Sequence, residues 1–203
     1  MSSGTVVQYR IDAEDRLTEV NDAWAAFAAA NGGDALQPSQ VVGRRLWDFL
    51  ADPTTRALYR AMLVRLRRDG PPIRFGFRCD AANVRRFLSM EMTAEPGGGV
   101  LFSLTSIATE PRTSVTLLEL GHAHSMAMIT ACGWCNQIRL PSGEWVEVEA
   151  AVMTLGLFGG GPLPDLSHGI CTECESVLTA ALDAPGMMET GTVSVGGTHR
   201  SVP

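Results

Sequence analysis

Lysine is absent from this 203-residue chain, so all 16 of its basic residues are arginines. We attribute this absence to compositional bias and attach no mechanism to it. No run of about 18 apolar residues occurs, which is the length that a membrane-spanning helix requires. The starting segment, Met-Ser-Ser-Gly, lacks the charged and apolar regions of a secretory signal. These absences predict a cytoplasmic protein that does not enter a membrane.

Sequence motifs of the common enzyme classes are missing as well. The chain has no phosphate loop, dinucleotide fingerprint or nucleophile elbow. It also has no recognisable set of an acid, a base and a nucleophile. We therefore expect a protein that is not an enzyme. Its 45% hydrophobic and 19% charged residues are ordinary for a chain that buries a core.

Negative charge is concentrated in the second half of the chain. Residues 1–110 carry 13 Arg against 13 Asp and Glu, whereas residues 111–203 carry 3 against 9, which accounts for the net charge of −6. Contacts between basic side chains and phosphates dominate the affinity of proteins for nucleic acids. We therefore expect no binding to DNA or RNA.

Four of the five cysteines form two C-x-x-C pairs that are separated by 35 residues. These pairs are Cys132 with Cys135, and Cys171 with Cys174. Each pair can supply one edge of a tetrahedron, so the spacing predicts a closed Zn²⁺ site with four thiolate ligands. A closed site leaves no position for water or substrate, so the metal is expected to stabilise the fold rather than perform chemistry.

Three histidines raise the question of further metal ligands. His168 precedes Cys171 by three residues, and we expect it to support the turn or donate a hydrogen bond to a thiolate. Replacement of one cysteine ligand by His168 is the alternative. The pair His122 and His124 has metal-ligand spacing, but with no other ligand beside it a metal site there is the less favoured interpretation.

Two other kinds of cysteine chemistry are disfavoured by position. A c-type haem needs a histidine directly after the second cysteine of a C-x-x-C pair, where this chain has Asn136 and Glu175. The fifth cysteine, Cys79, falls on the inward phase of an expected strand. Burial there would limit its thiolate character and access, so a redox-sensing role for it is disfavoured.

Strand and helix signals in the first half follow a consistent order. Asn21 and Asp52 are good helix caps, and Pro53 suits the first turn of the longest helix. Apolar and polar residues alternate in the later segments, which predicts strands. The expected strands are 6–11, 17–20, 73–79, 87–92 and 100–104, with helices after Asn21, at 46–50 and after Asp52. The order predicts an α+β fold with a five-stranded antiparallel sheet and helices gathered on one face.

Two segments of this half resemble a PAS domain. The segment 17–24, Leu-Thr-Glu-Val-Asn-Asp-Ala-Trp, is similar to the family's entry into its first helix. The segment 42–48, Val-Gly-Arg-Arg-Leu-Trp-Asp, is similar to its "hydrophobic-Gly-Arg-x-hydrophobic-aromatic" segment. The resemblance covers about residues 5–108. It implies a sensory or dimerising module, a homodimer, and a small ligand between sheet and helices.

The apolar side chains of this PAS-like sensor domain are expected to form an ordinary core. An aromatic, methionine-rich pocket for an unknown apolar ligand is the alternative. No histidine occurs in residues 1–110, so a haem held there by histidine is not expected; Met62, Met90, Met92 and Cys79 remain as conceivable iron ligands. The candidate pocket residues are Trp24, Phe27, Trp47, Tyr59, Met62, Phe75, Phe77, Met90 and Phe102.

The second half is expected to contain a linker (109–126), a zinc-binding module (127–182) and a disordered tail (183–203). The module should be a small zinc-stabilised domain made of a β-hairpin and helices. Its turn falls at 141–143, and its helices at 149–157 and 172–182. Asn136 follows the first cysteine pair where the chain must turn sharply, and is expected to adopt the left-handed conformation.

Three motifs of this module resemble a short domain attached to bacterial two-component and other PAS-containing proteins. They are Cys-x-Trp-Cys (132–135), Gly-Glu-Trp-Val (143–146) and Ser-His-Gly-Ile-Cys-x-x-Cys (167–174). The resemblance implies a bacterial signalling protein in which the PAS domain senses a ligand or dimerises, and the zinc module contacts a protein partner. A thiol redox switch, in which oxidation of the four cysteines releases zinc, is the alternative.

Overall fold

The computed structural model describes residues 6–31, 33–68, 70–119, 123–158 and 161–183. Its first sheet has the order β2-β1-β5-β4-β3, and every neighbouring pair is antiparallel. The strands are β1 (Val7–Ile11), β2 (Leu17–Val20), β3 (Ile73–Arg78), β4 (Val84–Ala94) and β5 (Val100–Pro111). The expected α+β class and the five-stranded antiparallel sheet are confirmed.

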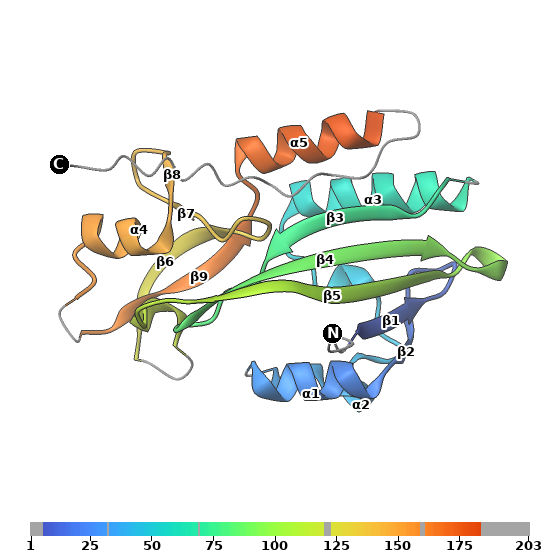
Figure 1. Cartoon of the computed structure of the whole chain (residues 1–203), viewed down its shortest axis with the longest axis horizontal. Coiled ribbons are helices and arrows are strands. Elements are labelled where there is room, and N and C mark those ends of the chain that lie inside the picture. Colours follow the sequence, from blue (N-terminus) through green and yellow to red (C-terminus); the bar gives the residue numbers. More distant parts are fainter. Residues whose placement is uncertain (1–5, 32, 69, 120–122, 159–160, 184–203) are drawn as a thin grey trace.

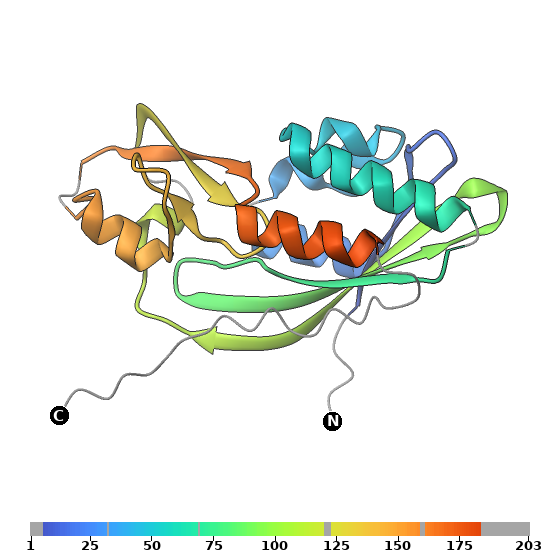
Figure 2. The same cartoon turned by 90° about the horizontal axis from the view of Figure 1, so that it is seen from above.

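Three helices lie on one side of this sheet (Figure 2). They are α1 (Asp22–Ala30), α2 (Pro38–Val41) and α3 (Pro53–Arg67). Both expected caps are confirmed, because Asn21 accepts a hydrogen bond from the Trp24 N–H and Asp52 accepts one from the Thr55 N–H. Of the expected helical patch at 46–50, Leu46–Asp48 form a short 3-10 turn.

The two faces of the sheet differ in chemistry. Ile73, Met92 and Phe102 are fully buried on the face beneath the helices. On the opposite face, polar pairs join neighbouring strands, such as Arg10 with Glu19 and Arg74 with Glu91. The sheet therefore buries one face and keeps polar side chains on the other, which is common in antiparallel sheets.

The second half forms a four-stranded mixed sheet in the order β8-β7-β6-β9, in which β6 and β9 are parallel. The hairpin expected around residues 141–143 is the β7–β8 pair. Neither β6 nor β9 was expected from the sequence. The elements are β6 (His124–Cys132), β7 (Ile138–Arg139), β8 (Trp145–Val146), α4 (Val148–Thr154), β9 (Leu163–Gly169) and α5 (Thr172–Asp183).

The segment expected to be a linker, 109–126, contributes to both sheets. Strand β5 extends to Pro111 and β6 begins at His124. Between them, Val115 and Leu117 are buried in one cluster with Ile138 and other residues of the second sheet. The sequence showed no periodicity here because the buried residues lie in a short 3-10 turn rather than in a helix or strand. The expected tail after Asp183 lies outside the described residues.

Helix α5 leaves the second sheet and runs back beside α3 (Figures 1 and 2). Arg65 of α3 donates hydrogen bonds to the carbonyl oxygens of Ala181 and Leu182, at 3.2 and 2.9 Å. Leu178 of α5 is buried in the same cluster as the core of the first sheet. The two halves of the chain therefore share this hydrophobic cluster, while the second sheet also has a cluster of its own. None of the described helices is both long and apolar enough to cross a membrane.

Candidate metal centre and the adjoining cleft

The first cysteine pair lies in a tight turn at the end of β6. The Asn136 N–H donates to the Cys132 carbonyl at 2.9 Å, and the Cys132 N–H donates to the Gln137 carbonyl at 2.7 Å. Asn136 has φ of +61°, which confirms the expected left-handed conformation. This turn brings the side chain of Cys135 back toward that of Cys132.

The second pair lies at the start of α5. Cys171 precedes the helix and Cys174 belongs to its first turn. The Gly133 N–H donates to the Gly169 carbonyl at 2.9 Å, so this bond ties the two cysteine turns together. A Cβ atom on Gly169 would lie 3.2 Å from the Thr130 methyl carbon, which is tight. A glycine therefore suits the point where β9 closes on β6.

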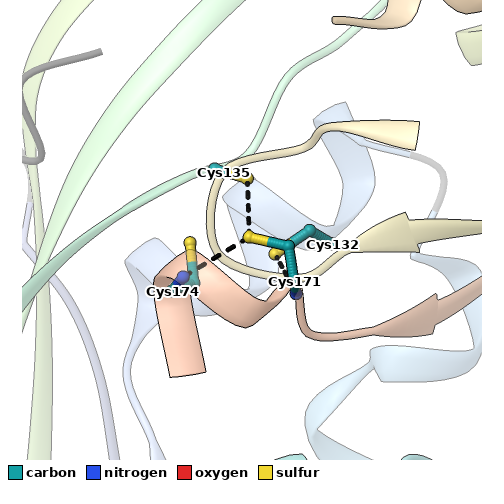
Figure 3. A group of neighbouring side chains, drawn as sticks. All are labelled: Cys132, Cys135, Cys171 and Cys174. Carbon is teal, nitrogen blue, oxygen red and sulfur yellow. Dashed lines mark hydrogen bonds between the residues drawn. The ribbon is translucent and has the colours of Figure 1, made fainter. Parts of the chain in front are cut away.

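The four sulfur atoms form one buried group, in which all Sγ atoms lie within 4.8 Å of one another. The Sγ atoms of Cys135 and Cys171 are 3.7 Å apart. A tetrahedral zinc site with Zn–S bonds of about 2.3 Å has S···S edges of about 3.8 Å, so the group fits this ion. Figure 3 shows the pairs converging from the β6 turn and the start of α5.

Backbone amides supply additional contacts to the sulfurs. The Cys171 N–H donates to Cys132 Sγ, and the Cys174 N–H donates to Cys171 Sγ, both at 3.4 Å. Such hydrogen bonds favour the thiolate form and orient the ligand atoms. The arrangement is therefore suited to holding negative charge on sulfur.

The protonation of the cysteines also shows why a cation suits this site. Hydrogen bonds from Cys135 and then Cys174 lower the pKa of the Cys132 thiol to about 2. The contact with Cys132 raises the pKa of Cys135 to about 12, and contacts with Cys132 and Cys135 raise that of Cys174. Without a cation, one thiolate thus suppresses ionisation of its neighbours. A divalent metal would offset this repulsion and release their protons.

The other proposed ligands lie elsewhere. The described four-cysteine group does not include His168, whose side chain is exposed on β9. No hydrogen bond from its ring to a cysteine occurs among the described residues. His122 lies outside the described residues, and His124 begins β6. Cys79 follows β3, half-buried, and burial raises the pKa of its thiol.

Trp134, in the middle of the first cysteine pair, connects the metal centre to the first sheet. Its ring centroid lies 6.1 Å from that of Tyr59 and 6.3 Å from that of Phe75. Its carbonyl accepts a hydrogen bond from the Arg78 N–H at 2.7 Å. These three contacts come from α3 and β3, so the cysteine turn is built into the surface of the first domain. The sequence motif gave no sign of this docking.

An ion-pair network forms a second connection. Arg78 is 6% exposed and pairs with Asp80 and with Glu147, which precedes α4. Arg112 pairs with Asp80 at 2.9 Å and with Glu149 of α4 at 3.2 Å. Burial lowers the pKa of Arg78, but its hydrogen bonds to Asp80 and Glu147 outweigh this and leave that pKa raised. Arg78 lies on the same face of β3 as the exposed Arg74, but contacts with the second half bury it there.

A cleft of about 620 Å³ lies between the two halves, beside the metal centre. The first half contributes the loop before α3, the start of that helix and part of β3. The second half contributes the Cys132–Cys135 turn and the end of β9. The lining includes Asp52, Tyr59, Phe75, Trp134 and His168.

The nine candidate pocket residues have two kinds of surroundings. Met62, Phe75, Met90 and Phe102 are buried in the core, and Phe102 stacks on Tyr9 with centroids 4.4 Å apart. Trp24, Trp47, Tyr59 and Phe77 pack against that core while partly exposed, and Phe27 is half-buried with Arg86 over its ring. Tyr59, Phe75 and Phe77 also line the cleft.

No protein-family model matches the chain, and no curated protein matches it. Among solved structures, it is similar to a sensory box sensor histidine kinase from Vibrio cholerae, at 8% identity and a TM-score of 0.36, over 51% of this chain and 82% of that one. It is also similar to the Aer2 receptor of Vibrio cholerae, described as a dual PAS-heme oxygen sensor, at 15% identity and a TM-score of 0.36, over 52% and 96%. Both likenesses are weak, and neither assigns haem, a signal or an activity to this chain.

Proposed function

We propose that this chain is a cytoplasmic regulatory protein built from a PAS-like sensor domain and a structural-zinc module. The first domain senses a small ligand or mediates homodimerisation, and the second contacts a protein partner. One observation carries this proposal: four buried cysteine sulfurs gather within 4.8 Å, inside the core that both domains share. A metal placed there would determine whether the second domain stays docked on the first.

The donor set favours a structural role for the metal. Four thiolates fill the coordination of Zn²⁺, so no position remains for a substrate or an activated water. All four cysteines are at most 7% exposed. Their burial also disfavours the redox switch, because an oxidant must reach a thiolate to react with it.

Metal analysis of matched serine variants tests the zinc site. We expect one zinc per chain in the wild type and in Cys79→Ser, which removes the cysteine outside the group. Cys171→Ser should lose the metal, because a three-thiolate remnant cannot close the tetrahedron. Zinc bound equally well by Cys171→Ser, or absent from the wild type, would contradict the proposal.

Peroxide treatment separates the structural role from the redox switch. Zinc release is followed with a chromogenic chelator while free thiols are counted. For a structural site, we expect Cys79, half-buried outside the group, to react before zinc appears. Prompt zinc release with loss of four thiols would support the switch instead.

The proposed partners follow from charge and from the resemblance to PAS domains. The acidic second half supports a protein partner and disfavours nucleic acids. We expect light scattering to give a homodimer at tens of micromolar protein.

We also expect no salt-dependent binding to duplex DNA.

A further inference from the structure

We propose that the cleft between the two domains binds a small organic cation that carries an apolar or aromatic group. This inference rests on the sensing role proposed above and identifies the site and the ligand class. Two features carry it: the aromatic rings that line the cleft and the charge at its edge.

The size and the position of the cleft suit a small molecule. Its volume of about 620 Å³ lies within the range of about 300 to 1,000 Å³ that is usual for ligand sites. Junctions between domains are among the places where such sites most often occur. Both domains contribute lining residues, so a bound molecule would touch α3 of one domain and β9 of the other.

Aromatic rings supply much of the lining. Tyr59, Phe75 and Trp134 form a cluster with centroids 6.1 to 6.3 Å apart, and Phe77 continues it, with its centroid 6.3 Å from that of Phe75. The planes of Tyr59 and Phe75 meet at 87°, so the lining rings face in different directions. Ring faces carry partial negative charge and attract cations, including quaternary ammonium groups.

The ionisable side chains of the described lining include one carboxylate and one imidazole, that of His168. Asp52 is the carboxylate, and one of its oxygens, Oδ2, caps α3 through the Thr55 N–H at 2.7 Å. The other oxygen, Oδ1, would lie 3.9 Å from a Cβ atom on Gly169, so it faces the end of β9. Asp52 makes no ion pair among the described residues, which leaves this carboxylate available to a cation.

Apart from His168, no basic side chain occurs in this lining, because none of its described residues is an arginine and the chain has no lysine. The N-terminus of α3 contributes about half a positive charge, which offsets only part of the carboxylate. Burial raises the pKa of Tyr59 to about 12, so its hydroxyl stays neutral. The one carboxylate of the described lining therefore favours a cation over an anion.

Calorimetric titration of the zinc-loaded full chain at pH 8 tests this proposal, since histidine side chains are ordinarily neutral at that pH. The probes share an aromatic ring and differ in charge: benzyltrimethylammonium, benzyl alcohol and benzoate. We expect the cation to bind at least about tenfold more tightly than benzyl alcohol, and benzoate not to bind. Equal binding of the cation and the alcohol would overturn the proposal.

Asp52→Asn locates the site, because asparagine caps a helix as well as aspartate does. We expect this variant to weaken binding of the cation about tenfold, with little change for benzyl alcohol and an unchanged melting temperature. Asp22→Asn, in the first turn of α1, is the matched control and should bind like the wild type. Undiminished cation binding by Asp52→Asn would place the ligand elsewhere and overturn the assignment. Zinc content is measured separately, so a failure of the cation to bind would not contradict the proposed zinc site.

Discussion

Two arginines on the same face of β3 show how strongly position changes the energetics of one residue type. Arg74 is 55% exposed and pairs with Glu91 across the strands. Arg78, four residues later, is 6% exposed and bridges Asp80 and Glu147. The first pair is screened by water, whereas the second lies beneath the second domain.

We expect Arg78→Gln to lower the free energy of unfolding by about 3 kcal/mol, because it removes one of the two arginines that pair with the buried Asp80 carboxylate. Arg74→Gln, the control on the same strand, should cost at most about 1 kcal/mol. Urea denaturation of both variants measures this difference. Equal costs would mean that the buried network does not stabilise the junction.

At the scale of elements, the first cysteine turn depends on one backbone conformation. Asn136 holds φ at +61°, where a β-branched side chain is strained and glycine is not. The turn also aligns Cys135 with Cys132, so backbone strain in it would displace the sulfur atoms that are proposed to bind the metal.

We expect Asn136→Val to weaken zinc binding about tenfold, because the left-handed conformation costs about 1–2 kcal/mol for such a residue. Asn136→Gly relieves the strain and should stay within a few-fold of the wild type. Competition with a chelator of known affinity gives both values. If Asn136→Val leaves the zinc affinity unchanged, the turn does not depend on the left-handed conformation at residue 136.

The same elements show what the sequence could and could not reveal. The caps at Asn21 and Asp52 were predictable because each depends on neighbours within a few residues, and the grouping of the four cysteines was predictable from the spacing within each C-x-x-C pair. Strands β6 and β9 were not, because their parallel pairing joins segments about 37 residues apart, such as Ala131 with His168. The burial of Arg78 was not predictable for a related reason: strand periodicity assigns a residue to a face but cannot tell whether a later segment covers that face.

For the whole molecule, the shared core implies that a metal bound by the four cysteines would support both domains. Cys132, Trp134 and Cys174 are buried in one cluster with Phe75 and Met90. Loss of the metal would therefore loosen contacts well beyond the cysteine turns.

We expect removal of zinc by a strong chelator to reduce hydrogen-exchange protection in β3 and α3 as well as in β6 and α5. Thermal unfolding of the holo form should show one cooperative transition, because the cluster around the cysteines joins the halves. Exchange of an unrelated strand, β2, gives the internal comparison and should change least. Protection lost only within residues 123–183 would show that the domains fold independently.

Helix α5 is fixed at both ends. Its first turn holds Cys174 of the metal centre, and its last carbonyls accept hydrogen bonds from Arg65 of α3. Twelve residues at about 1.5 Å each make a helix of about 18 Å between the candidate metal centre and Arg65, near the end of α3. Any displacement of α3 must then pull on the cysteine cluster or break the Arg65 contacts. A shift of α3 would thus be transmitted along α5 to the four cysteines, and a change at the cysteines would be transmitted to α3.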